Sequence, residues 1–115
     1  MEALVTKFLV LYLSSVPAAD QMAESTREQA DAGTARWMSW AKRAGNHLVD
    51  LGSPVGHATQ VTKGAARASD ITVAGFSILQ ATTRQQVIDL LTDHPHYRSP
   101  GASIEILEFV PMLGK

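Results

Sequence analysis

Short apolar runs along the chain alternate with longer stretches in which apolar residues recur every three or four positions. Runs rich in leucine, valine, isoleucine and aromatic residues that stop at serine, glycine or proline are typical of strands. Five segments fit this description and are predicted as strands: residues 6–13, 47–51, 57–63, 71–80 and 103–110. The small and polar segment 64–70 is expected to be a turn or a loop.

The main helix is predicted between a capping signal and a glycine. Ser25-x-x-Glu28 and Thr26-x-x-Gln29 both fit a capping box, in which a hydroxyl and a carboxylate or amide satisfy free N–H groups of the first turn. The helix is expected to extend to Gly45, because glycine readily adopts the left-handed conformation that ends a helix. Small and aromatic residues recur at helical spacing and are expected to form its buried stripe: Ala30, Gly33, Trp37, Trp40, Ala41 and Ala44.

A shorter helix is predicted between the last two strands. Thr82 or Thr83 would cap it, and it would end before Pro95, because proline disfavours a helical conformation in the residue that precedes it. Its inner face is expected to hold Val87, Leu90 and Leu91. Residues 14–25 form a connector, with one helical turn after Pro17.

The order of these elements predicts the fold class. Strand, helix, two or three strands, helix and strand match the split βαβ pattern of ferredoxin-like domains. We therefore expect residues 1–115 to form a single α+β domain with an antiparallel sheet and both helices on one face. The first strand is apolar on both faces, with Phe8, Val10 and Tyr12 on one and Leu9, Leu11 and Leu13 on the other. The face without helices would be covered by a second copy of the chain, in a homodimer.

Composition narrows the functional classes. Hydrophobic residues make up 45% of the 115 residues and the net charge is −1, which is typical of a globular protein and argues against a dedicated nucleic-acid binder. The chain has no cysteine, hence no disulfide and no thiolate chemistry, and we expect it to be cytoplasmic. The apolar run 8–13 is too short to cross a bilayer, and Glu2 offsets Lys7, so we interpret it as a strand rather than a signal peptide and expect no membrane partner.

Six segments resemble the YCII-related family of dimeric α/β-barrel proteins over residues 6–110. They are Lys7–Tyr12, Trp37–Trp40, Leu48–Pro54, Gly75–Gln80, Asp93–His96 and Ala102–Ile106. The resemblance implies a homodimeric α/β barrel that needs no cofactor, and some members are thought to use a His–Asp pair in the cleft between helix and sheet. Relatives on this fold include muconolactone isomerases and cofactor-free monooxygenases. This chain has no histidine near its first strand, and Ala68–Thr72 stands where the family has Asp-Gly-Pro-Phe.

The sharpest candidate for chemistry is the run Asp93-His94-Pro95-His96. An extended His-x-His places both imidazoles on one side, and Asp93 would orient one of them. The alternative is structural, because an imidazole near a helix C-terminus interacts favourably with the helix dipole. No obvious third ligand accompanies the pair, so no metal site is predicted. His57, in a loop rich in glycine and proline, is the second candidate for a catalytic base.

Four further residues are candidates for binding a small hydrophobic or aromatic ligand: Trp37, Trp40, Tyr97 and Glu105. The two indoles belong either to the core or to the mouth of a pocket, since a buried indole N–H needs a partner. Glu105 and Glu108 would lie on opposite faces of the last strand, so one of them would point into the barrel.

Three functional hypotheses follow. The first is a small-molecule-binding homodimer whose pocket lies between sheet and helices. The second is a cofactor-free isomerase, lyase or monooxygenase that acts on a small hydrophobic ring compound, with His94 or His57 as the proton shuttle. The third is a non-enzymatic interaction domain.

Overall fold

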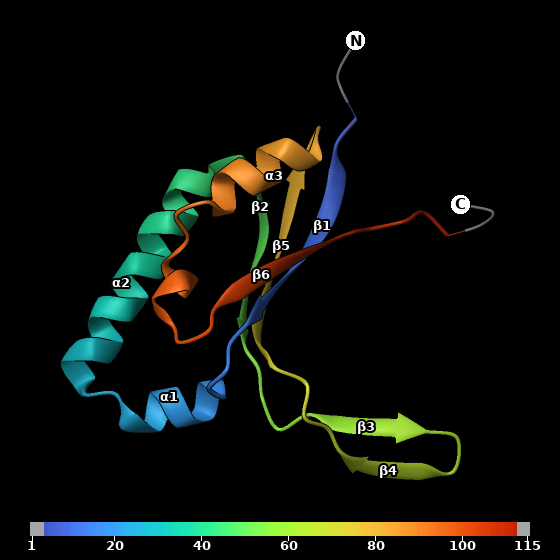
Figure 1. Cartoon of the computed structure of the whole chain (residues 1–115). Helices are drawn as coiled ribbons and strands as arrows, with labels where there is room; N and C mark the ends of the chain where they lie inside the picture. Colours follow the sequence, from blue (N-terminus) through green and yellow to red (C-terminus); the bar gives the residue numbers. More distant parts are fainter. Residues whose placement is uncertain (1–3, 113–115) are drawn as a thin grey trace.

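Four strands pair into one antiparallel sheet, and two more form a separate hairpin, in the computed structural model, which describes residues 4–112 (Figure 1). The sheet consists of β1 (Thr6–Leu13), β2 (Leu48–Pro54), β5 (Val73–Ala81) and β6 (Ser103–Glu108). The hairpin consists of β3 (Thr59–Thr62) and β4 (Ala65–Ala68). The helices are α1 (Ala18–Glu24), α2 (Arg27–Ala44) and α3 (Arg84–Leu91), with short 3₁₀ turns η1 (Gly45–His47) and η2 (Pro95–Arg98).

The strand order β2-β5-β1-β6 interlocks two crossover units. Every neighbouring pair in the sheet is antiparallel, so β1 runs parallel to β2 and β5 runs parallel to β6. The unit β1-α2-β2 therefore encloses β5, and the unit β5-α3-β6 encloses β1. This confirms an α+β fold with an antiparallel sheet. The sheet is not closed into a barrel, because β2 and β6 are its two edges.

Local signals set most element boundaries. The Thr26 side chain accepts a hydrogen bond from the Gln29 N–H, and the Gln29 side chain accepts one from the Thr26 N–H, which is the second of the two predicted capping boxes. Thr83 caps α3 in the same way. Gly45 ends α2 with a φ of 53°.

Several expectations from the sequence differ from the structure, and two of them concern the hairpin and β2. The segment 64–70, expected to be a turn or loop, contains β4, which pairs with β3 around a turn at Gly64. The second strand was expected to end at residue 51 but extends to Pro54. A proline is tolerated there because β2 is an edge strand, where a missing N–H interrupts no ladder on its outer side.

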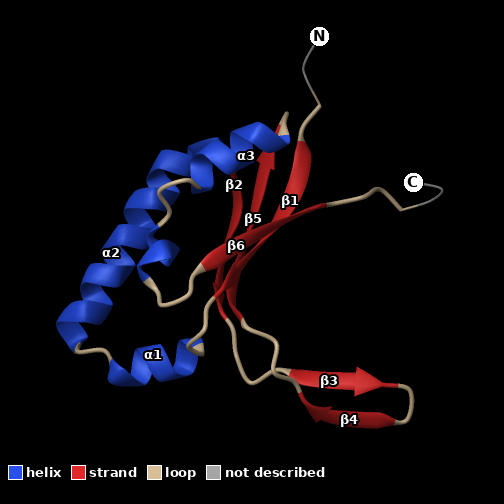
Figure 2. Ribbon diagram, in the orientation of Figure 1, coloured by secondary structure: helices blue, strands red, loops and turns tan. Residues whose placement is uncertain are grey.

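The core lies between the sheet and the helices α2 and α3, which cover the same face (Figure 2). From β1, the side chains of Phe8, Val10 and Tyr12 enter it, and α2 contributes Trp40 and Ala44. The remaining buried apolar residues of this core are Leu79, Ala81, Val87 and Leu91. The first half of α2 is largely exposed, including Ala30, which was expected to lie in the buried stripe.

The opposite face of the sheet is apolar and carries no helix (Figure 2). We call it the open face. It holds apolar residues of β1, β5 and β6 and the residue that directly follows β6: Leu9, Leu11, Leu13, Phe76, Ile78, Leu107 and Phe109. The first five are only partly buried, and Leu107 and Phe109 are each 45% exposed.

The molecule is flat and extended for its length. Its extents are 50 × 44 × 19 Å and its radius of gyration is 16.0 Å, whereas a compact domain of this length has a radius of about 13 Å. The shortest extent, 19 Å, corresponds to one layer of helices packed on one sheet. The hairpin β3–β4 projects from the body, and every residue in its two strands is exposed (Figure 1). The open face and the hairpin are therefore both accessible for contacts with another molecule.

One prediction concerns the contact between β2 and β5. Gly52 has a φ of 80°, and a Cβ atom there would overlap the carbonyl oxygen of Phe76. Because that obstacle is backbone within the sheet, we expect Gly52→Ala to lower the free energy of unfolding by about 2 kcal/mol or more in urea titrations. Gly33→Ala is the matched control. Gly33 lies in α2 with nothing within 4 Å of its Cβ position, so this substitution should stabilise the protein by about 0.5–1 kcal/mol. Equal stability of the two variants would contradict the close approach of Gly52 to the Phe76 carbonyl.

Candidate functional site

Five rings meet on the helix side of the sheet, and we call them the aromatic–imidazole cluster: Tyr12, Trp37, Trp40, His94 and His96. His94 stands at its centre. Its ring is stacked on Tyr12 at a centroid distance of 4.7 Å, and it meets Trp37 and Trp40 edge to face at 4.4 Å each. The cluster joins β1, α2 and the segment after α3, so residues distant in the chain pack around one imidazole.

His94 is buried, with 2% of its surface exposed. Its Nδ1 accepts a hydrogen bond of 2.9 Å from the backbone N–H of His96. The neutral ring therefore carries its proton on Nε2, and this atom is buried with no hydrogen-bond partner among the described residues. Burial, together with the nearby His96 and Arg43, lowers the pKa of His94 from 6.5 to about 3.

His96 has a different role, because its partners are backbone carbonyls. Its Nε2 lies 2.6 Å from the Leu13 carbonyl oxygen and 3.1 Å from that of Ser103. Carbonyl oxygens only accept, so Nε2 donates to both. These hydrogen bonds join the end of β1 to the start of β6 and fix the turn η2 against the sheet.

Tyr12 and Ser77 form a buried hydrogen-bond chain across the sheet. The Tyr12 hydroxyl donates to Ser77 Oγ at 2.8 Å, and Ser77 donates to the Leu51 carbonyl at 2.6 Å. Burial raises the pKa of Tyr12 to about 12, although the hydrogen bond to Ser77 opposes this shift. The chain links β1, β5 and β2 through side chains. The apolar pattern of these strands gave no sign of this polar contact, because Ser77 occupies a core-facing position in β5.

Asp93 pairs with an arginine. Its Oδ2 accepts a hydrogen bond of 2.8 Å from Arg43 Nη1, and this bond lowers the pKa of the Asp93 carboxyl. Both side chains are more than half exposed. The pair joins the segment after α3 to the last turn of α2. Asp93 thus faces Arg43, and no hydrogen bond to the His94 ring is present.

The remaining candidates lie apart from the cluster. His57 is exposed in the loop between β2 and β3, with a φ of 55°. Glu105 lies opposite Leu11 on the open face, whereas Glu108 contacts Arg84 of α3 on the other face, so the two carboxylates are on opposite sides as predicted. Trp37 is partly buried in the cluster, and Trp40 is buried with its indole N–H donating to the Leu90 carbonyl at 2.8 Å.

Tyr97 borders an apolar hollow of about 330 Å³ between α3, η2 and β6. Its walls are Ile88, Leu91, Thr92, Tyr97, Ile104 and Ile106. Tyr97 is 48% exposed, and its hydroxyl has no hydrogen bond to another described residue. We call this feature the Tyr97 hollow. It adjoins the cluster through β6, since Ile104 pairs with Tyr12 across the strands.

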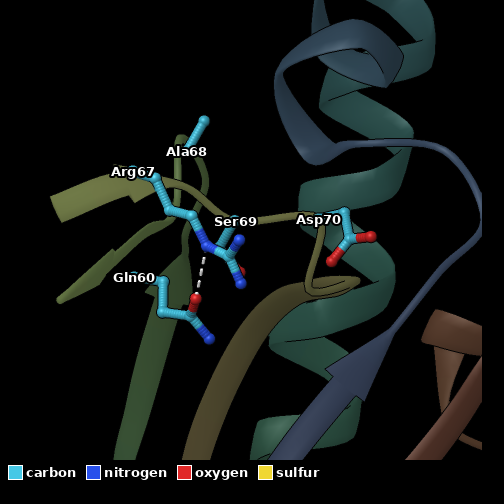
Figure 3. A pocket seen from close by; sticks show the side chains of 5 residues that line it. All are labelled: Gln60, Arg67, Ala68, Ser69 and Asp70. Carbon is cyan, nitrogen blue, oxygen red and sulfur yellow. Dashed lines mark hydrogen bonds between the residues drawn. The ribbon is translucent and has the colours of Figure 1, made fainter. Parts of the chain in front are cut away.

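A second hollow, of about 280 Å³, lies at the base of the hairpin (Figure 3). It is lined by Gln60, Arg67, Ala68, Ser69 and Asp70. Arg67 donates to the Gln60 side chain at 2.7 Å, and the Asp70 carboxylate points away from this pair (Figure 3). Its polar side chains are mostly exposed, so we treat it as a surface depression of the hairpin.

The chemical capacity of the cluster is limited by its packing. A general base must reach the proton that it removes, but His94 is enclosed by three aromatic rings and the only acceptor nitrogen is already occupied. Across residues 4–112, no histidine forms a hydrogen bond with a carboxylate, and no three His, Cys, Asp or Glu residues gather closely enough to hold a metal ion. Within the same range, no helix has the length and apolar character needed to span a membrane.

The depressed pKa of His94 predicts loss of stability in acid. The folded state binds fewer protons than the unfolded state between pH 3 and 6.5, so stability rises with pH across this window. The contribution of His94 is complete above about pH 6.5 and is lost as the pH falls toward 3. Between pH 6.5 and about 4.5 it should amount to on the order of 2 kcal/mol.

The measurement is urea unfolding at several pH values for the unchanged chain and for His94→Phe, which keeps a ring but cannot be protonated. We expect the pH dependence to be clearly shallower in the variant. His57→Asn is the control, because His57 is exposed and asparagine tolerates its positive φ. The account of His94 is wrong if the unchanged chain and His94→Phe lose stability equally on acidification.

Comparison with known proteins leaves the family open. Neither a search of protein-family models nor a search of curated proteins finds a match to this chain.

Proposed function

We propose that this chain is a small-molecule-binding homodimer of the ferredoxin-like, YCII-related kind. The observation that carries the proposal is the open face, on which apolar residues of three strands lie together without a helix over them. The strand order β2-β5-β1-β6 with both long helices on one side suits the ferredoxin-like pattern. In this proposal the open faces of two copies pack against each other, and each copy retains the Tyr97 hollow.

Removal of apolar surface from water favours self-pairing. The apolar side chains of the open face remain accessible in the single chain, and a contiguous apolar patch of this kind marks an interaction site. A second copy presents the same patch, so a two-fold axis would bring leucine and phenylalanine residues of both copies together. Glu105 and Lys7 lie on the same face and would remain at its border.

The Tyr97 hollow is the candidate site for a small ligand. Its walls are mainly isoleucine and leucine, and its volume of about 330 Å³ lies at the lower end of the range for ligand pockets. The free hydroxyl of Tyr97 would fix the orientation of a polar substituent. The ligand class that suits this lining is a small ring compound with one hydrogen-bonding group.

A non-enzymatic interaction domain is the second candidate. The observation that favours it is the filled cluster around His94, which leaves that imidazole no room for a substrate. The enzymatic hypothesis would require His94 to become accessible or His57 to gain an orienting partner. The ligand test below separates binding from a purely structural domain.

Self-pairing is tested by sedimentation equilibrium. We expect the unchanged chain to sediment at micromolar concentration as a particle of twice 12.4 kDa. Leu9→Asp should shift the protein to the single-chain mass, because a carboxylate between Ile78 and Leu107 on the open face would be buried among apolar side chains. Met38→Lys is the control: Met38 is 53% exposed on α2, away from the open face, and should leave the mass unchanged. A single-chain mass for the unchanged protein would contradict the proposal.

Ligand binding is tested by NMR titration of the labelled protein with 2-naphthol. We expect saturable shift changes at the amides of Leu91, Tyr97 and Ile104, with a dissociation constant on the order of 1 mM or below. Ile104→Trp should abolish these changes by filling the Tyr97 hollow, while Met38→Trp, which adds an indole on exposed α2, should preserve them. Shifts confined to the open face, or no shifts, would argue for the interaction domain.

A further inference from the structure

We propose that the hairpin β3–β4 is an arm that packs against the second copy of the chain. This inference rests on the self-pairing proposed above and adds to it a second contact surface. Four features of the structure support it: the size of the open face, the direction and length of the hairpin, the chemistry of its two faces, and its charge.

The open face alone is small for a stable interface. Four strands about 4.8 Å apart, with eight residues in β1 rising about 3.3 Å each, give a face of about 19 by 26 Å, or roughly 500 Å² in projection. A standard stable interface buries about 800 Å² on each partner. Accessible area exceeds projected area, so the open face lies at the small end of the range for stable interfaces, and contacts from segments that border it would enlarge the interface.

The hairpin has the direction and the length to supply them. It leaves the body on the side away from the helices, which is the side of the open face, and the segment after β6 leaves on the same side (Figures 1 and 2). Each strand of the hairpin has four residues and is therefore about 14 Å long. Two sheets that pack face to face lie about 10 Å apart, so a hairpin of this length spans the gap and reaches the partner.

The two faces of the hairpin differ in chemistry. Cross-strand pairing places Thr59 beside Ala68 and Val61 beside Ala66 on one face. The other face carries the hydrogen-bonded pair of Gln60 and Arg67, together with Thr62 and Ala65. The first face is small and apolar, and Val61 is 76% exposed. An isolated two-stranded hairpin is only marginally stable in water, so a partner against this face would stabilise it.

The charge of the hairpin suits a second copy of the same chain. Residues 59–68 contain Lys63 and Arg67 and no acidic residue. The net charge of the chain is −1, so a contribution of +2 from the hairpin leaves −3 on the rest. A positive arm therefore meets a negative body, and Glu105 on the open face offers an exposed carboxylate.

The test compares the dimer dissociation constants of two single variants by sedimentation equilibrium of the full chain. Val61→Glu places a carboxylate on the apolar face and should raise the dissociation constant about tenfold or more. Thr62→Glu is the matched control: it adds the same charge to the neighbouring residue, which points to the opposite face, and should change the constant less than about threefold. Both positions are exposed in the single chain, so neither substitution should disturb its fold, which circular dichroism of the dilute monomer would check.

A second measurement reports on the arm itself. The chain has no cysteine, so Val61→Cys and Thr62→Cys each provide a unique site for an environment-sensitive dye. The emission of the dye at position 61 should shift to shorter wavelength when rising concentration forms the dimer, and that at position 62 should shift less. A stable dimer in which Val61→Glu binds as tightly as the unchanged chain, or in which neither dye responds, overturns the arm and leaves the pairing of open faces intact. A monomeric unchanged chain overturns both.

Discussion

The apolar character of both faces of β1 is the constraint on which the rest of the structure depends. One face receives α2 and α3 and holds the buried core, with Phe8, Val10 and Tyr12 pointing into it. The other face has the same apolar character but no helix of this chain over it. Because the polypeptide provides only one helix layer, the molecule is about 19 Å thin and exposes apolar surface. Assembly is the simplest way to remove that surface from water.

The same constraint explains where the polar chemistry lies. A buried sheet face tolerates polar groups only where they find partners, and Tyr12, Ser77 and His96 all do so through hydrogen bonds to neighbouring strands. His94 is the exception, since its Nε2 is enclosed without a partner. Because the imidazole is buried and its Nδ1 already accepts a hydrogen bond, protonation of His94 is unfavourable in the folded state, and the stability of the domain is sensitive to acid. The main role of the cluster is therefore structural: it holds the helices against the sheet.

Much of the fold follows from local signals, whereas the site does not. Thr26 and Thr83 begin helices, and Gly45 ends one, through interactions with residues close by in the chain. The positions of the apolar residues in β1 identify its two faces. The hairpin was only half predicted, because the alanine-rich β4 has weak strand propensity and is recognised only through its pairing with β3. The partner of Asp93 is 50 positions away and that of Tyr12 is 65 positions away. Such contacts depend on how helices and strands pack against one another, and this packing cannot be predicted from a local sequence pattern.

Methyl NMR with a soluble paramagnetic probe shows whether a second copy covers the open face. The methyl groups of Leu9, Leu11 and Ile78 report on the open face, and those of the exposed Met22 and Met38 provide reference points in α1 and α2. We expect the open-face methyls to be protected from the probe in the unchanged chain, and those of Leu11 and Ile78 to become accessible in Leu9→Asp. Strong broadening of these methyls in the unchanged chain would contradict this expectation.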